Sequence, residues 1–322
     1  MCSLPYASFH EAYANAPPPD PHVIYRARLF AVLLGVAYLT PPPLVNAQPV
    51  SPPAITVAGE GRNTYLLLSG VIGGVAGYHR IERRLVELGN RVIVIDPYLL
   101  AIDSDDVSFD ALAKRVDAEL AARGVDTVRI VGHAHGGGVA IRLAANARGR
   151  ASELFLLNVG ALTDHRNPVF TSSIRLAPLI TRLPGGRAFL RRRILDGLRQ
   201  NGGHTEWLDS STVRAYTEPM LDNIGRVVAM AMRLGKAEEP EPLAAVIQRL
   251  RVPVTVIIGA LTCPASPGRD ELAALEPLGR LVRIDTLAGV CHFPHEELPD
   301  ELVHRLLRVR ESVGGTRGLG VR

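Results

Sequence analysis

The sequence predicts an α/β fold in which a mostly parallel sheet is covered by helices on both faces. Apolar strand-like runs alternate with segments of helical spacing from residue 63 onward, a rhythm that is typical of parallel sheets. A strand–turn–helix junction rich in glycine lies at 128–138. The rhythm stops at 161–251, where we expect several short helices and no strand. These observations together indicate one sheet domain that is interrupted by a helical insertion.

Each element follows from its local pattern. The run at 64–69 is continuously apolar, as in a strand that is buried on both faces, and a glycine-rich turn follows it. Gly89 and Asn90 end the first predicted helix as a C-cap does. Further strands are expected at 91–95, 125–131, 153–159, 252–258 and 280–286. Helices are expected at 78–88, 109–123, 133–148 and 300–309.

The first 47 residues have the pattern of an export signal. Arg26 and Arg28 precede an apolar run at 29–39, and a small-residue site follows at 45–47. The run is too short for a bilayer span, which needs about 20 residues. We therefore predict a signal peptide that is cleaved near Ala47, no stable membrane span after cleavage, and an exported protein, secreted or periplasmic. The alternative is a proline-rich tail on a cytoplasmic protein.

The remaining chain divides at the edges of the insertion. A sheet core is expected at 48–160 and 252–313, a helical segment at 161–251 and a flexible tail at 314–322. Hydrophobic residues make up 47% of the chain, which allows a large core. The formal charge is only +4, and the three consecutive arginines at 191–193 indicate a solvent-exposed helix face. We therefore predict no nucleic-acid partner.

The junction at 128–138 is the most informative motif. Gly132 and Gly136 lie two residues before and after Ala134, a spacing that allows a sharp turn between a strand and a helix. Such a turn lifts the central side chain above the sheet, next to a helix N-terminus that favours developing negative charge. A nucleophilic serine is usual at the centre. Alanine stands there instead, and its methyl group cannot attack a carbonyl.

These segments resemble the α/β-hydrolase family with a helical cap inserted between strands six and seven. The resemblance runs from about residue 63 to 308 and includes the loop 289–294, which is similar to the catalytic-histidine loop of the family. It implies that His292 is the histidine of the triad. The acid position falls on Thr262, with Asp270 and Glu271 well down the same loop and Asp164 as a possible displaced acid. Two of the three triad positions are therefore substituted.

The resemblance also implies an oxyanion hole and a pocket. Its donors would be the backbone N–H groups of His135 and Val71, and Ser69-Gly70 stands where the family usually has His-Gly. His133 and Trp207 are further candidates for the pocket, although packing roles explain them equally well. Cys263 and Cys291 lie in the loops after the last two strands, so a disulfide is expected; buried free thiols are the alternative. Three histidines, at 133, 135 and 292, lack a suitable spacing for a metal, and no metal site or cofactor is predicted.

A dinucleotide-binding fold is the competing interpretation. Gly70, Gly73, Gly74 and Gly77 follow a strand, and Asp96 ends the next strand, which imitates the glycine fingerprint and its ribose-binding acid. The spacing G-x-G-x-x-G is not satisfied, however, because an extra residue separates the first two glycines. This interpretation also leaves the second glycine motif and the late histidine loop unexplained.

Three functions are compatible with the sequence. The first is a non-hydrolytic pseudoenzyme that binds a small, apolar or ester-like molecule or a partner. The second is an enzyme that uses His292 as general base beside the oxyanion hole, as in a lyase, a cyclase or a cofactor-free reaction. The third is an ester or amide hydrolase in which Ala134 replaces the serine through an engineered or sequencing change. Loss of the acid at Thr262 favours the first two.

Overall fold

The computed structural model describes residues 53–146, 149–160 and 174–314. The predicted leader at 1–47 and all but the first residue of the predicted tail at 314–322 lie outside these residues. All the described residues belong to one compact unit by their contacts.

Seven strands form one sheet in the order β1-β3-β2-β4-β5-β6-β7. The strands are β1 (Ile55–Ala58), β2 (Thr64–Leu68), β3 (Arg91–Ile95), β4 (Val128–His133), β5 (Ala151–Leu157), β6 (Val254–Gly259) and β7 (Val282–Leu287). All neighbours run parallel except β1, which pairs antiparallel with β3 at the edge. The predicted fold class is confirmed. β1 is missing from the predicted elements, because four partly exposed residues carry little periodic signal.

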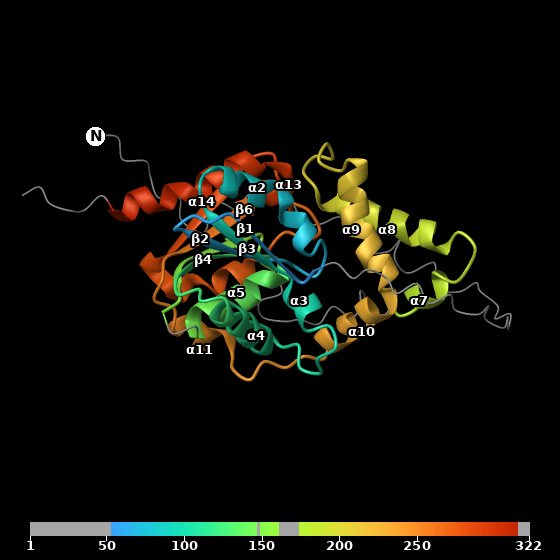
Figure 1. The fold of residues 1–322 in the computed structure, drawn as a ribbon, viewed down its shortest axis with the longest axis horizontal. Helices are drawn as coiled ribbons and strands as arrows, with labels where there is room; N and C mark the ends of the chain where they lie inside the picture. The colour runs from blue at the N-terminus through green and yellow to red at the C-terminus, as the bar shows by residue number, and fades with distance from the viewer. Residues whose placement is uncertain (1–52, 147–148, 161–173, 315–322) are drawn as a thin grey trace, which may run out of the picture. The chain divides into compact units, whose positions relative to one another are not determined.

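Helices cover both faces of the sheet (Figure 1). On one face α2 (His79–Glu87) packs against α14 (Pro299–Gly314), and on the other α4 (Phe109–Ala122) packs against α5 (His135–Asn146). All five residues of β2 are buried, so Tyr65 and Leu67 join the core beneath α2 and α14 while their neighbours face the opposite layer. Full burial of each such leucine contributes about 2 kcal/mol.

Shorter helices connect the strands to these layers. They are the 3-10 helix η1 (Val75–Tyr78) and α3 (Pro97–Leu100), then α12 (Arg269–Ala273), η2 (Glu276–Leu281) and α13 (Pro294–Glu297). Asp96 caps α3 by accepting hydrogen bonds from the backbone N–H groups of Tyr98 and Leu99, each at 2.9 Å.

The insertion lies between β5 and β6, the fifth and sixth of the seven strands described. Its helices are α7 (Ala177–Ile180), α8 (Gly186–Asn201), α9 (Ser210–Asp222), α10 (Ile224–Leu234) and α11 (Leu243–Gln248). α11 packs against α5 of the sheet layer, whereas α7 to α10 pack against one another and form the cap (Figure 1). Among the helices described, none combines the length and the apolar character that a bilayer span requires.

Candidate functional site

The strand–turn–helix junction adopts the sharp turn that the glycine spacing predicts. β4 ends at His133, α5 begins at His135, and Ala134 between them has a φ of 49°. A Cβ on Gly132 would lie 2.7 Å from the carbonyl oxygen of Gly136, and a Cβ on Gly136 would lie 2.4 Å from that of Ser69. Both glycines are therefore required by the close approach of backbone to backbone. The strained conformation is kept although Ala134 offers only a methyl group.

The loop after β2 lies directly beside this turn. A Cβ on Gly70 would be 3.4 Å from the Cβ of Ala134, so Val71 follows at the edge of the same space. His135 is the first residue of α5, where a backbone N–H has no acceptor within the helix. The structure thus brings together the two segments that were expected to supply oxyanion-hole donors. Ser69 is buried next to them, and its hydroxyl has no partner among the described residues.

His292 lies in the loop between β7 and α13, close to the end of β4. Its backbone N–H donates to the carbonyl of Asn201 at 2.9 Å, and its own carbonyl accepts from His133 Nε2 at 2.8 Å. The two imidazole rings are 4.7 Å apart between centroids. Burial, followed by the neighbouring His133 ring, holds the pKa of His292 well below its usual range. His292 is therefore neutral at physiological pH.

The Nδ1 atom of His292 is buried and has no hydrogen-bond partner in the part of the chain that the structure describes. A carboxylate would bind this atom in a complete triad. Thr262, at the expected acid position, is exposed, and so is Asp270. Glu271 instead accepts from the backbone N–H of Gly268 at 3.1 Å. Asp164, the possible displaced acid, lies outside the described residues.

Two residues that the motifs did not single out position the histidine loop. The Oε1 atom of Glu297 accepts from the backbone N–H groups of Cys291 and Phe293 at 3.3 and 3.1 Å. Its Oε2 atom accepts from that of Gly203, in the cap, at 2.6 Å. Asn158, at the end of β5, donates to the carbonyl of Cys291. The signal available in the sequence was a pair of glutamates directly after the histidine loop, in a segment that is otherwise apolar.

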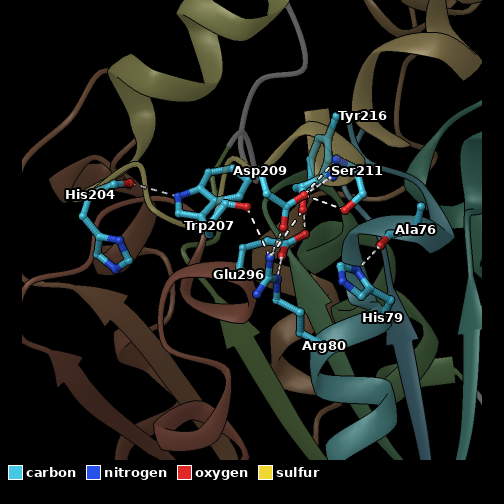
Figure 2. Close-up of polar contacts among 10 residues, drawn as sticks. Ala76, His79, Arg80, His204, Trp207, Asp209, Ser211, Tyr216 and Glu296 are labelled. Atoms are coloured by element: carbon cyan, nitrogen blue, oxygen red, sulfur yellow. Dashed lines mark hydrogen bonds and ion pairs between the residues drawn. The ribbon is translucent and has the colours of Figure 1, made fainter. Parts of the chain in front are cut away.

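Arg80 on α2 connects the core to the cap (Figure 2). Its guanidinium donates to Glu296 Oε2 at 2.9 Å and to Asp209 Oδ2 at 3.3 Å. The hydroxyl of Tyr216, on α9, donates to Glu296 Oε1 at 3.0 Å. Burial raises the pKa of Glu296 to about 7 in spite of these partners. The cluster of Arg80, Glu296, Asp209 and Tyr216 therefore ties α2 and α13 to the start of the cap helix α9.

The tyrosine of this cluster also explains the glycines of the loop after β2. A Cβ on Gly73 would lie 2.8 Å from Cε1 of Tyr216, and a Cβ on Gly77 would lie 2.8 Å from its hydroxyl oxygen. Trp207 packs against Phe293 and Tyr216, with ring centroids 5.1 and 5.9 Å away, and donates to the carbonyl of His204 (Figure 2). These glycines make room for a cap side chain, so the dinucleotide-binding interpretation is wrong.

Cys263 and Cys291 form a pair in the structure, with Cα atoms 6.2 Å apart. Cys263 follows β6 next to Thr262, and Cys291 precedes His292. The pair therefore joins the loop at the acid position to the histidine loop. Within the described ranges, no group of three or more histidine, cysteine or acidic residues is arranged to hold a metal ion.

A cavity of about 100 Å³ lies between the loop after β2, α3 and the cap helices α9 and α10. Its wall is mostly aliphatic, and it includes Val71, Leu99, Ile102, Met220, Val227 and Met230. Asp96 and Tyr98 are polar members of the wall. Ala134, His292, Ser69, Gly70, His133 and Trp207 do not line it. The cavity thus adjoins the turn of Ala134 through Val71, while the triad positions lie outside its wall.

Comparison with solved structures assigns the fold. An esterase from Thermogutta terrifontis is 19% identical with a TM-score of 0.60, and the match covers 81% of this chain and 93% of that one. A bromoperoxidase from Bacillus anthracis is 14% identical with a TM-score of 0.61 over 80% and 94% of the two chains. An epoxide hydrolase is 19% identical with a TM-score of 0.60 over 80% and 94%. No protein-family model matches the chain. The chain has the α/β-hydrolase fold, as its motifs predict.

Proposed function

We propose that this α/β-hydrolase-fold protein is non-hydrolytic and binds a small apolar molecule in the cavity between its core and its cap. One observation carries the proposal. The imidazole of His292 is held in the expected loop, yet its Nδ1 atom meets no acid among the described residues, and the turn residue Ala134 carries only a methyl group. A nucleophile and its base act as a unit, so a turn without the hydroxyl, beside a histidine that meets no acid among the described residues, supports a non-hydrolytic role.

The cavity supports the binding half of the proposal. Its wall is formed by aliphatic and methionine side chains from both the core and the cap, a composition that is typical of small-molecule sites. An engineered apolar cavity of about 150 Å³ binds benzene, so a volume of about 100 Å³ suits a molecule of around five heavy atoms. Arg80, through Asp209, and Glu296, through Tyr216, hold α9 in place beside it.

A second candidate function is supported by the state of His292. Because the pKa of this residue is held low, its imidazole is neutral and available as a general base. The expected oxyanion-hole donors are the backbone N–H groups of His135 and Val71. A cofactor-free proton abstraction would need no serine. The same low pKa makes the imidazole a weak base, and we therefore place this function second.

Catalysis is tested with the purified chain from Gln48 onward. We expect aryl acetates and aryl butyrates to be hydrolysed no faster than by the His292→Ala variant. Turnover that disappears in His292→Ala would overturn the non-hydrolytic assignment and favour the general-base reaction. The same assay with Thr262→Ala is the matched control, because this variant changes only the threonine that stands at the expected acid position.

Binding is tested through the methionines. Met220 and Met230 line the cavity, whereas Met232 does not, so ¹³C-labelled methionine methyl groups report on the site and carry an internal control. We expect n-pentane or 1-butanol to move the methyl resonances of Met220 and Met230 and to leave that of Met232 in place. If neither compound moves them, the cavity is not a binding site.

Export and the disulfide are part of the proposal. The leader pattern at 26–47 and the pairing of Cys263 with Cys291 both fit an oxidising compartment. We expect expression of the full chain in a bacterium to yield a mature protein that starts near Gln48, without free thiols at 263 and 291. Retention of the leader on a reduced cytoplasmic protein would contradict this assignment.

A further inference from the structure

The cap exposes a group of large apolar side chains along α7 and the start of α8. Leu176, Leu179 and Phe189 are 61%, 58% and 53% exposed, more than any other leucine, isoleucine, valine or phenylalanine that the structure describes. Leu183, between them in the sequence, is exposed as well. Single apolar residues are ordinary on a protein surface, whereas a group of them marks a contact site.

The leucines of this group lie along one side of α7 and the turn after it. Hydrogen bonds of helical spacing run from the carbonyl of Leu176 to the N–H of Leu183 through successive residues. Positions 176, 179 and 183 are three and four residues apart, so their side chains share a face. The opposite side of α7, with the buried Ala177, packs against α10.

The outer face of α8 combines an apolar side chain with basic ones. Arg192 and Arg193 follow Phe189 by three and four residues, which places all three on one side of the helix. They are exposed, whereas the buried Leu198 belongs to the side of α8 that packs against α9. Figure 1 shows α7 and α8 at the outer end of the cap, with α9 and α10 between them and the sheet.

This segment of the cap carries a large excess of positive charge. Residues 174–202 contain seven arginines and one acidic residue, Asp196. Two of the arginines, at 187 and 191, are paired with Glu218 and Asp222 of α9. The other five are exposed, and Asp196 lies within 4.0 Å of two of them. These five are Arg175, Arg182, Arg192, Arg193 and Arg199.

We propose that the outer surface of α7 and α8 docks onto an anionic lipid bilayer. The leucines and Phe189 enter the boundary between head groups and acyl chains, and the exposed arginines bind the lipid phosphates. The helices lie on the bilayer, because none of those described has the length and apolar character to cross it. The inference goes beyond the proposed function, since it concerns the surface of the cap and not the cavity.

Other occupants fit only part of this surface. A second copy of the chain would bring two sets of unpaired arginines together, which like charges oppose. A nucleic acid supplies phosphates, but leucine side chains cannot stack on its bases as aromatic residues do. An anionic bilayer offers negative charge and an apolar layer a few ångströms apart, so it matches both the arginines and the leucines.

Vesicle co-sedimentation tests the proposal. The chain from Gln48 onward contains all the described residues and lacks the apolar run at 29–39, so the leader cannot cause binding. We expect it to bind vesicles of phosphatidylcholine and phosphatidylglycerol, about seven to three, at least tenfold more tightly than vesicles of phosphatidylcholine alone. Binding should weaken as sodium chloride is raised from about 50 to 500 mM. Equal binding to the two vesicles, or binding to neither, would overturn the proposal.

Two double variants separate the apolar and the charged contributions. Arg192→Gln/Arg193→Gln should weaken binding to the anionic vesicles about 25-fold, because each arginine near such a surface contributes about fivefold. Leu179→Ser/Phe189→Ser should weaken it by about tenfold or more, because two apolar side chains no longer enter the bilayer. All four positions are exposed, so the urea midpoint should not change.

The matched control is Arg83→Gln/Leu88→Ser, which removes one exposed arginine and one exposed leucine from the region of α2 on the core. It should bind the vesicles as the parent does. Loss of binding in the arginine variant alone would mean a purely electrostatic contact, as with a nucleic acid, and would overturn docking on lipid. Sedimentation of the free protein as a dimer that Leu179→Ser/Phe189→Ser dissociates would identify the surface as a contact between copies and also overturn it.

Discussion

The ring of His133 lies against the ring of His292, and its Nε2 atom donates to the main-chain carbonyl of His292 at 2.8 Å. His133, the residue before the turn at Ala134, thereby holds the histidine loop in place. The donation assigns the proton of neutral His133 to Nε2. His295 completes the group, with its ring centroid 4.5 Å from that of His133. The turn at Ala134 and the histidine loop are thus held together by the hydrogen bond of His133 and by tilted and edge-to-face contacts between imidazoles, without a hydrogen bond between serine and histidine.

These three histidines should make the protein acid-sensitive. Burial holds the pKa of His133 and of His292 well below 6.5 and lowers that of His295 to about 3. The folded chain keeps them neutral, while the unfolded chain protonates them below pH 6.5. Stability is therefore complete above that pH and is lost as the pH falls, by up to about 1.4 kcal/mol per pH unit for each histidine.

Urea unfolding at pH 7.5, 6.5, 5.5 and 5.0 measures this loss. His295→Phe retains a flat ring against Tyr78, which lies 5.0 Å away, and should remove about a third of the histidine contribution to the slope. His304→Gln, at an exposed position on α14, is the matched control and should leave the slope unchanged. A slope that is the same in His295→Phe and in the parent would show that His295 is charged in the folded state.

Restoring the nucleophile alone should not restore an esterase. Ala134→Ser places a hydroxyl at the centre of the turn, but no carboxylate among the described residues meets the buried Nδ1 atom of His292. We expect aryl-ester turnover within tenfold of the His292→Ala background. Loss of triad geometry costs about 10⁴-fold in kcat in a serine protease, which sets the scale. Strong activity in the single variant would reveal an acid that the described residues do not show.

The double variant Ala134→Ser/Thr262→Asp tests the missing acid directly. Position 262 follows β6 next to Cys263, whose pairing with Cys291 brings this loop to the histidine loop. We expect turnover above that of Ala134→Ser, and we expect it to disappear when His292→Ala is added. Equal turnover in the single and the double variant would mean that a carboxylate at 262 does not reach the imidazole.

The pairing of Cys263 with Cys291 should stabilise the fold. It closes a loop with a sequence separation of 28, for which the chain-entropy model gives about 3–4 kcal/mol. The double variant Cys263→Ser/Cys291→Ser should therefore unfold at lower urea, and a reductant should shift the parent protein but not the variant. A midpoint that is insensitive to both changes would show that the two sulfurs are not bonded in solution.

The ion pair of Arg80 with Glu296 should couple cap attachment to pH (Figure 2). The Glu296 side chain is 0% exposed, so Arg80→Met leaves a buried carboxylate uncompensated, a change that costs about 3 kcal/mol at pH 8. Because burial already raises the pKa of Glu296 to about 7, the carboxyl is protonated at pH 5.5 and the cost should shrink there. Arg80→Met/Glu296→Gln should recover most of the stability at pH 8.

Urea unfolding at both pH values checks this coupling. Arg83→Met, which removes an exposed pair with Glu87 on the same helix, should change stability by less than about 0.5 kcal/mol at either pH. An Arg80→Met loss that is the same at pH 5.5 and pH 8 would contradict the assignment of the effect to the charge of Glu296.

The parallel part of the sheet and the sharp turn at Ala134 were predictable because local sequence patterns specify them. Buried parallel strands such as β2 are continuously apolar, and the glycines at 132 and 136 are dictated by backbone contacts within a few residues of the turn. β1 was not predictable, because its pairing with β3 depends on the partner strand and its four residues are only partly buried.

The residues that support the site were missed for a similar reason. Arg80 and Glu296 are separated by 216 positions, and nothing near either residue indicates the other. The glycines at 73 and 77 imitate a phosphate-binding pattern in the sequence, but in the structure they accommodate Tyr216 from the cap. The position of Asp96 and Tyr98 in a cavity wall depends equally on α9 and α10, whose placement no local pattern supplies.

The φ of 49° at Ala134 also bears on how this protein could change by mutation. The turn already holds an L-residue in the conformation that a nucleophile needs, so a serine would enter without rearranging the backbone. Every alanine codon becomes a serine codon by a single base substitution, whereas a threonine codon needs at least two to encode aspartate. On the proposed non-hydrolytic assignment, the obstacle to hydrolase activity is therefore the residue at Thr262 rather than the turn at Ala134.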